Sequence, residues 1–212
     1  MPPDLLAAAL LIARKDLAIE FRTRSAFFSA VVFSLLSVAI FYFAWDPTSI
    51  PAAELAPGVL WVTFAFGGLL GLHRSFSVED ADGAMDALLS APIAREAIFL
   101  GKAGANLVFV LAVQVVAIPA VVLLYNVGGG AAWFPIAGIA ILSAIGLVAV
   151  GTLFSSVVAN TRLAELLLPL LALPFFVPIV TSAAQATAQL LAAYDLVFVA
   201  ACTWLYPHSL DS

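Results

Sequence analysis

The chain has 212 residues, of which 64% are hydrophobic and 10% charged, and its formal net charge is −5. Soluble domains are roughly 45–50% apolar and about 25% charged, so a water-soluble globule of this length could not bury so much apolar surface. A bilayer can accommodate it, because a helix of about 20 apolar residues spans the hydrocarbon with its backbone groups bonded internally. The composition therefore predicts an all-α integral membrane protein, with the lipid bilayer as a partner and no nucleic acid.

Apolar segments bounded by charged residues, Pro or Gly follow one another along the chain. They predict six transmembrane helices, near residues 26–44, 57–73, 103–127, 132–158, 163–182 and 190–206. The fifth contains Pro169, Pro174 and Pro178, so we expect it to be kinked or broken. The sixth contains Asp195, which is expected to lie close to a span end. No further domain is expected, so residues 1–212 form a single transmembrane domain.

Residues 4–23 are too charged to span the membrane, but their apolar side chains recur at helical spacing. Leu6, Leu10, Leu17 and Phe21 form this apolar face, which predicts an amphipathic helix at the membrane interface. Such a helix either rests among the lipid headgroups or docks on a cytoplasmic partner. The sequence leaves both alternatives open.

The basic residues predict the orientation of the chain. All eight lie before the first span, in the loop after the second or in the loop after the fourth. Because Lys and Arg accumulate on the cytoplasmic side, both termini are expected to be cytoplasmic. The first apolar segment follows four basic residues without a nearby small-residue cleavage site, so a cleaved signal peptide is not expected.

The sequence offers no catalytic machinery of its own. The pair Gly101-Lys102 lacks the upstream glycine and following hydroxyl of a nucleotide-binding P-loop. The single cysteine, Cys202, and the two histidines, His73 and His208, have no second ligand at metal or haem spacing. Catalytic, cofactor-binding and metal-binding residues are therefore expected to be absent, and few ionisable residues lie within the spans to support ion-coupled transport.

The longest polar stretch is the loop 74–102, which we expect to be cytoplasmic. Within it, Met85, Leu88 and Leu89 form an apolar face at helical spacing, and Pro92 ends the helix. Such a short helix is not stable alone in water, so it needs a protein groove or the bilayer surface. In a protein groove the three apolar side chains would be the anchors.

This loop resembles the membrane subunits of exporter-type ABC transporters of the ABC-2 class, in which an acidic segment precedes a D/E-x-L-L motif and a proline. The matching residues are Glu79, Gly83, Asp86, Leu88, Leu89 and Pro92. The segment Ala56-Pro57-Gly58-Val59-Leu60-Trp61 and the pattern Arg74-x-Phe76 narrow the resemblance to the haem exporter protein B family of cytochrome c maturation. The likeness extends over nearly the whole chain in length and span spacing.

The resemblance implies a multi-pass permease of the bacterial plasma (inner) membrane, which is not itself an enzyme. A homodimer of such subunits would sit on two copies of a cytoplasmic ATPase subunit, which binds the ATP. Further partners implied are a haem-handling membrane subunit, a small single-span subunit and a periplasmic haem chaperone. ATP hydrolysis would drive haem delivery or release of the haem-loaded chaperone, and haem could be held in the complex rather than by this chain alone.

The resemblance also implies roles for individual residues. The cytoplasmic coupling helix that senses the ATPase would comprise Glu79, Asp82, Gly83, Met85, Asp86, Leu88, Leu89 and Pro92. Pro57, Gly58 and Trp61 would form a motif at the outer membrane boundary, where a partner docks or Trp61 simply anchors the chain. Two other functions stay open: an ABC-2 exporter of a drug, lipid or glycan, and a membrane scaffold that transports nothing.

Overall fold

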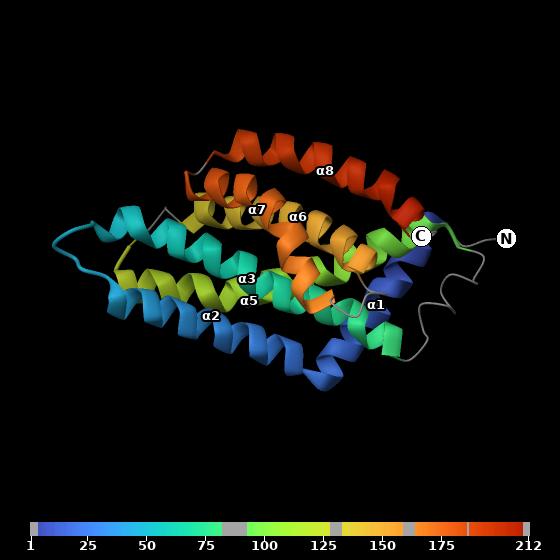
Figure 1. Ribbon diagram of the computed structural model, residues 1–212, viewed down its shortest axis with the longest axis horizontal. Helices are drawn as coiled ribbons and strands as arrows, with labels where there is room; N and C mark the ends of the chain where they lie inside the picture. The colour runs from blue at the N-terminus through green and yellow to red at the C-terminus, as the bar shows by residue number, and fades with distance from the viewer. Residues whose placement is uncertain (1–3, 82–92, 128–132, 159–163, 186, 210–212) are drawn as a thin grey trace.

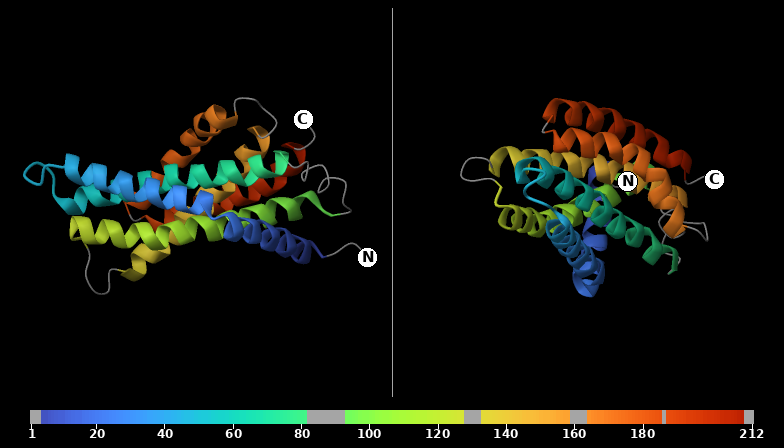
Figure 2. Two further views of the ribbon diagram at one scale, coloured as in Figure 1. Left: turned by 90° about the horizontal axis from the view of Figure 1, so that it is seen from below. Right: turned by 60° about the vertical axis from the view of Figure 1, so that its left-hand side comes forward.

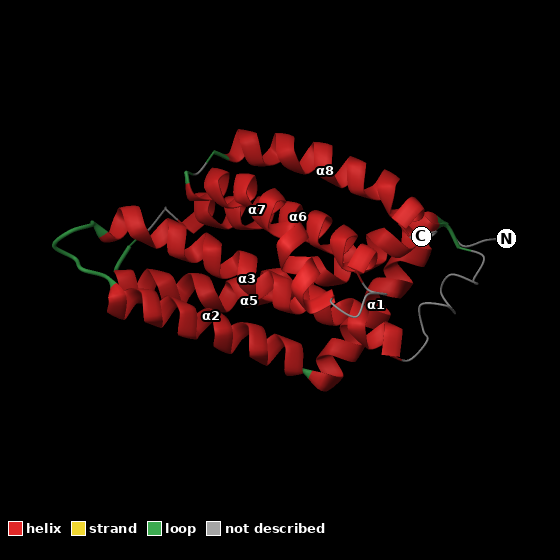
Figure 3. Cartoon of the chain, viewed as in Figure 1, coloured by secondary structure: helices red, strands yellow, loops and turns green. Residues whose placement is uncertain are grey.

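The computed structural model describes residues 4–81, 93–127, 133–158, 164–185 and 187–209. Within these ranges the chain forms only helices, turns and loops (Figure 3). The helices are α1 (Leu5–Thr23), α2 (Ser25–Ala44), α3 (Ala52–Ala81), α5 (Arg95–Tyr125), α6 (Trp133–Val158), α7 (Ala164–Ala184) and α8 (Ala188–Ser209). The prediction of an all-α chain is confirmed for the described residues.

Within the described ranges, five helices are long and apolar enough to cross a bilayer. They are α2, the Ala52–Leu70 part of α3, α5, the Ile136–Val158 part of α6 and the Ala188–Pro207 part of α8. The apolar part of α7, Leu167–Ala183, is shorter, so a sixth crossing stays a prediction. Although Pro169, Pro174 and Pro178 lie inside it, α7 is one helix whose ribbon bends (Figure 1). Of the two alternatives that the sequence left open, a kinked or a broken helix, α7 is therefore not the broken one.

The helices on either side of the predicted coupling loop are longer than expected. Helix α3 continues to Ala81, past the predicted span end at 73, and α5 begins at Arg95, well before 103. No Gly or Pro lies between Leu72 and Ala81, so nothing in the local sequence stops the helix where it becomes polar. The predicted loop 74–102 is therefore helical at both ends.

The bundle is held together by one large apolar cluster contributed by α2, α3, α5, α6, α7 and α8. Phe64 of α3, Leu147 of α6 and Phe176 of α7 are buried in it. Helix α6 packs against α3, α5, α7 and α8, whereas α2 packs against α3 and α5 at the side of the bundle (Figures 1 and 2). The outer faces of α2 and α8 expose large apolar side chains, among them Phe43 and Leu196, as helices in contact with lipid do.

Candidate functional site

One end of the bundle gathers the elements that flank residues 82–92. The C-terminal end of α3, the start of α5, helix α1 and the C-terminal end of α8 all lie there (Figure 1). A separate hydrophobic cluster joins three of them, with Ile12 from α1, Ile98 and Phe99 from α5, and Cys202 and Tyr206 from α8. The rings of Phe99 and Tyr206 lie 5.2 Å apart. The first turns of α5 are thus clamped between the N-terminal and C-terminal helices.

Helix α1 is docked on α5 of the same chain. Its buried side chains are small or medium-sized: Ala8, Ala9 and Ile12. At Gly101 of α5 a Cβ atom would lie 2.7 Å from the Cβ of Ile12 and 2.8 Å from the backbone oxygen of Ala9. Gly101 therefore lets the two helices approach closely, which small residues commonly do between helices in membranes.

The apolar face that the sequence suggested for α1 is not the docked one. Leu6 is 76% exposed, Leu10 62% and Phe21 69%. Leu6 and Leu10 can therefore enter the membrane interface. Leu17, which is half-buried, and Phe21 instead lie beside Val108 of α5. From the sequence, α1 was expected either to rest among the headgroups or to dock on a cytoplasmic partner. Its main contact is neither of these, but α5 of the same chain.

A lysine is buried in the contact between α1 and α5. The side chain of Lys102 is 0% exposed, and its Nζ lies 3.7 Å from Oδ2 of Asp16. Oδ1 of Asp16 lies 3.1 Å from Nζ of Lys15, which is on the exposed side of α1. The sequence analysis had placed Lys102 at the border of a loop. Its spacing of four residues from Ile98 and from Asn106, both buried, is the signal that could have placed it on the inner face of a helix.

A second polar contact joins α5 to α8 at this end. Nη1 of Arg95 donates a hydrogen bond to the backbone oxygen of Pro207, at 3.1 Å. The acceptor lies in the last turn of α8, where backbone oxygens lack a partner within the helix. Arg95 thus holds the end of α8 against the start of α5.

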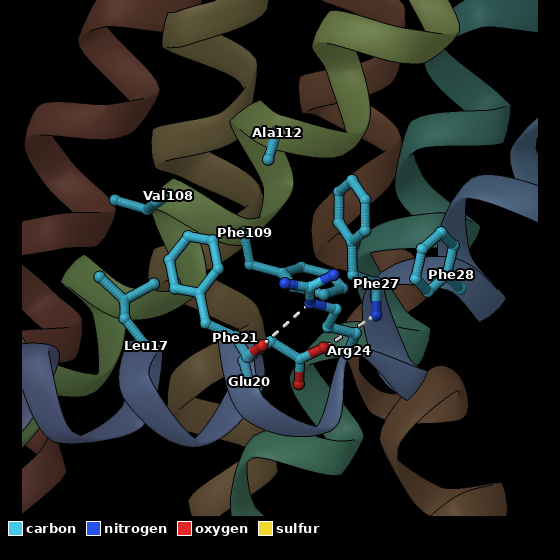
Figure 4. A pocket seen from close by; sticks show the side chains of 9 residues that line it. All are labelled: Leu17, Glu20, Phe21, Arg24, Phe27, Phe28, Val108, Phe109 and Ala112. Carbon is cyan, nitrogen blue, oxygen red and sulfur yellow. Dashed lines mark hydrogen bonds between the residues drawn. The ribbon is translucent and has the colours of Figure 1, made fainter.

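Helices α1 and α2 meet at a one-residue elbow. Arg24 has the left-handed backbone conformation, with φ of 55°, and its N–H donates to the backbone oxygen of Glu20 at 2.7 Å. Oε1 of Glu20 accepts a hydrogen bond from the N–H of Phe27 at 2.9 Å, in the first turn of α2 (Figure 4). One carboxylate from the end of α1 therefore caps the next helix and fixes the angle between them.

The predicted coupling residues lie at or beyond the edge of the described chain. Glu79 lies in the last part of α3. The others lie outside the described residues: Asp82, Gly83, Met85, Asp86, Leu88, Leu89 and Pro92. Their coupling role stays a prediction.

The predicted outer-boundary motif lies inside α3 rather than at its start. Pro57 and Gly58 are half-buried, and Trp61 is only 4% exposed, with its ring edge-on to Phe64 at 5.4 Å. Because α3 begins at Ala52, Trp61 lies roughly 14 Å along the helix at about 1.5 Å per residue. The ring therefore packs within the bundle, and the role of the motif at the outer boundary stays a prediction.

Other aromatic residues gather near the end opposite α1. Tyr42 and Trp45 each lie 5.5 Å from the ring of Tyr125, and the indole N–H of Trp45 donates to the backbone oxygen of Ile50 at 2.8 Å. In the following turn, the hydroxyls of Thr48 and Ser49 and the N–H of Thr48 donate to the carboxylate of Asp46, and these bonds lower the pKa of Asp46. This cluster, rather than Trp61, has the position of an interfacial aromatic group.

Two polar side chains, Asn106 and Asp195, are buried within the bundle, where few ionisable residues were expected. Asn106 of α5 donates to the hydroxyl of Thr152 of α6 at 3.2 Å and so joins two helices. Asp195 is 6% exposed, and among the described residues its carboxylate oxygens have no hydrogen-bond partner. It lies seven residues after the first residue of α8, Ala188, so it is farther from the helix end than the sequence suggested.

The buried carboxyl of Asp195 depends on a glycine in the facing helix. A Cβ at Gly146 would lie 2.5 Å from Oδ1 of Asp195 and 3.1 Å from Cδ1 of Ile179. We expect Gly146→Ala to destabilise the chain by roughly 1–3 kcal/mol through overpacking, measured by SDS unfolding in mixed micelles. Adding Asp195→Ala should recover most of that loss. Gly138→Ala is the control, because nothing lies within 4 Å of a Cβ there, and an equal loss in both glycine variants would contradict the contact.

Comparison with known proteins extends over all seven described helices. The family model described as CcmB protein matches residues 7–206. A protein of Paracoccus denitrificans named heme exporter protein B is 32% identical over 199 residues, covering 92% of this chain and 90% of the relative. Proteins of the same name from Rhodobacter capsulatus and Pseudomonas aeruginosa are 32% and 27% identical, covering 77% and 85% of this chain and 75% and 82% of the relatives. The chain belongs to the CcmB family, the haem exporter protein B family that its loop motif resembles.

Proposed function

We propose that the chain is the membrane-spanning permease subunit of an ABC transporter complex for cytochrome c maturation. It couples ATP hydrolysis by a partner ATPase to haem delivery or to release of a haem-loaded periplasmic chaperone. The relatives' printed name, heme exporter protein B, supports the haem cargo. The P-loop is missing from the sequence, which supports an ATPase on another chain.

The observation that carries the proposal is the convergence of α1, α3, α5 and α8 at the end that flanks residues 82–92. Two of these helices pass from that end into the large apolar cluster, through Phe64 of α3 and Ala117 of α5. A force applied between Ala81 and Ile93 would therefore reach the centre of the bundle along two packed helices. Such rigid elements can carry energetic coupling between distant sites.

The coupling helix is assigned to Glu79 and the segment that follows it, up to Pro92. Met85, Leu88 and Leu89 are the apolar anchors that enter a groove of the ATPase. Closure of an ATPase dimer would then move the ends of α3 and α5. Helix α1, joined to α5 through Gly101 and Lys102, would move with them.

The arrangement in the membrane follows from the same proposal. The chain crosses the bacterial inner membrane six times, with α7 as the fifth span and both termini in the cytoplasm. The exposed apolar faces of α2 and α8 are available to lipid, to a second copy of the chain and to the haem-handling and single-span subunits. ATP binds to the ATPase subunit, and any haem is held in the complex.

Co-purification in mild detergent followed by mass spectrometry tests the coupling assignment. We expect the ATPase subunit to be recovered with the wild-type chain, and its recovery to fall about tenfold or more with Leu89→Asp, because a charge cannot replace a buried apolar anchor (a 1.4 kcal/mol change is already tenfold). Leu89→Met is the control, since it keeps the apolar volume. Formation of c-type cytochromes should fall in parallel with the recovery.

The same experiment separates the other functions. A chain that purifies without an ATPase under every condition would favour the scaffold. Recovery of the ATPase together with normal c-type cytochromes in Leu89→Asp would favour export of a drug, lipid or glycan. Either result would contradict the proposed role.

A further inference from the structure

A groove lies on the surface of the bundle at the elbow between α1 and α2. It has a volume of about 300 Å³, and side chains from α1, α2 and α5 line it (Figure 4). Most of these are apolar, including Phe27 of α2 and Phe109 of α5, whose rings meet edge to face at 6.4 Å. Val108 and Ala112 continue the wall along α5. The feature is therefore a mostly apolar groove between three helices.

The groove opens toward the surroundings of the bundle. Phe28 is 56% exposed, Phe21 69% and Val108 45%. It lies directly beside Ser25, the first residue of the span Ser25–Ala44. An apolar groove at the start of a candidate span is suited to the lipid at the edge of the bilayer rather than to water.

The cationic side chain of Arg24 is one of the residues that line the groove. Nε of Arg24 donates to the backbone oxygen of Phe21 at 3.1 Å, which holds the side chain among the residues that line the groove (Figure 4). Within the described part of the chain, the structure gives Arg24 no carboxylate partner, and Oε1 of the neighbouring Glu20 accepts the N–H of Phe27. A second cation, Arg22, is exposed on the same elbow. The remaining guanidinium N–H groups of Arg24 can therefore receive an anion, and their fork suits a phosphate.

The backbone of Arg24 supports a role for this placement. Its φ of 55° is unusual for a residue other than Gly, Asn or Asp. A glycine at the elbow would relieve that strain but would leave no cation at the groove. Arg24 is thus both the residue with the strained backbone and the residue that places a positive charge beside the apolar groove.

We propose that the groove binds one anionic phospholipid of the leaflet next to α1, with an acyl chain against Phe27, Val108 and Phe109 and the phosphate on Arg24. Small-molecule sites begin at roughly 300 Å³. The apolar wall beside one guanidinium matches an acyl chain next to a phosphate. The bound lipid would brace the elbow and thereby hold α1 in its docked position.

Native mass spectrometry of the purified full chain tests this site. The delipidated chain in detergent is titrated with phosphatidylglycerol, and the fraction carrying one lipid is measured. Ala112→Trp, which fills the groove, is expected to lower that fraction about tenfold. Arg24→Gly removes the cation while permitting the left-handed backbone, and should weaken binding about fivefold, the effect of one basic residue on an anionic lipid. Val32→Trp, on the exposed face of α2 outside the groove, is the matched control and should bind as the wild type does.

Each contrary result has a defined meaning. Equal lipid retention by the wild type, Ala112→Trp and Val32→Trp would show only general lipid association and would overturn the proposal. Wild-type affinity in Arg24→Gly would overturn the placement of the phosphate. Loss of a co-purified membrane subunit in Ala112→Trp, with lipid binding unchanged, would assign the groove to a protein partner instead.

Discussion

A valine at Gly101 is expected to separate α1 from α5 and to destabilise the chain by roughly 3 kcal/mol, the upper part of the range for overpacking. The first added atom would already lie 2.7 Å from the Cβ of Ile12 and 2.8 Å from the backbone oxygen of Ala9. A backbone oxygen cannot rotate away, so α1 as a whole has to move. Gly101→Ala should show the same effect at smaller size, because better helix propensity, about 1 kcal/mol, offsets part of the clash.

Gly104 provides the matched control for this experiment. It lies one turn later on α5, where a Cβ would meet Ala13 at 3.9 Å, an ordinary contact. Gly104→Ala should therefore be neutral or slightly stabilising. Docking is measured by disulfide formation between Ala8→Cys and Ala97→Cys, whose parent residues share one apolar cluster, and stability by SDS unfolding. Equal crosslinking in Gly101→Val and the wild type would disprove close packing as the role of Gly101.

Removal of the Asp16 carboxylate is expected to destabilise the chain by roughly 3–5 kcal/mol, because it takes away the carboxylate that lies 3.7 Å from the buried Nζ of Lys102. Lys102→Met should be much milder. It replaces the buried charge with an apolar side chain of similar length and leaves Asp16 beside Lys15, which is 39% exposed. Each variant removes one charge. Asp16→Ala is the more damaging because it leaves the buried charge of Lys102 in place, whereas Lys102→Met removes that buried charge.

The double variant Asp16→Ala/Lys102→Met tests this explanation. If the loss in Asp16→Ala arises from an uncompensated buried charge, the second substitution should restore most of the stability. SDS unfolding of the two single variants and the double variant gives the coupling free energy. Additive losses in the double variant would show that Asp16 and Lys102 act independently. Increased salt should change the unfolding of the wild type little, since buried pairs are weakly screened.

The faces of the helices show where sequence reasoning reached its limit. In water, the larger apolar side chains of an amphipathic helix indicate the packed face. In α1 that rule selected Leu6, Leu10, Leu17 and Phe21. The fully buried side chains are instead those of Ala8, Ala9 and Ile12. Lipid and a protein interior are both apolar, so side-chain hydrophobicity does not distinguish them, and small residues mark the contact instead.

The same limit explains why Trp61 and Asp195 are more buried than their place in the sequence suggested. An aromatic ring near a predicted span end suggests an interfacial anchor, and a carboxylate near a span end suggests contact with water. Both interpretations depended on span boundaries, which apolarity alone places poorly. Helix α3 begins earlier than 57 and α8 earlier than 190, so both residues lie deeper in their helices and are buried.

The approximate positions of five membrane helices and the family of the chain followed from the sequence by itself, because the length of an apolar segment and a motif between Pro57 and Pro92 are properties of local sequence. The docking of α1 on α5, the burial of Lys102 beside Asp16 and the groove at the α1–α2 elbow were decided only by the tertiary structure. Each of these joins residues that are far apart in the chain. Their contact depends on how closely two helices approach, which a glycine or a single elbow residue permits but no periodicity reveals.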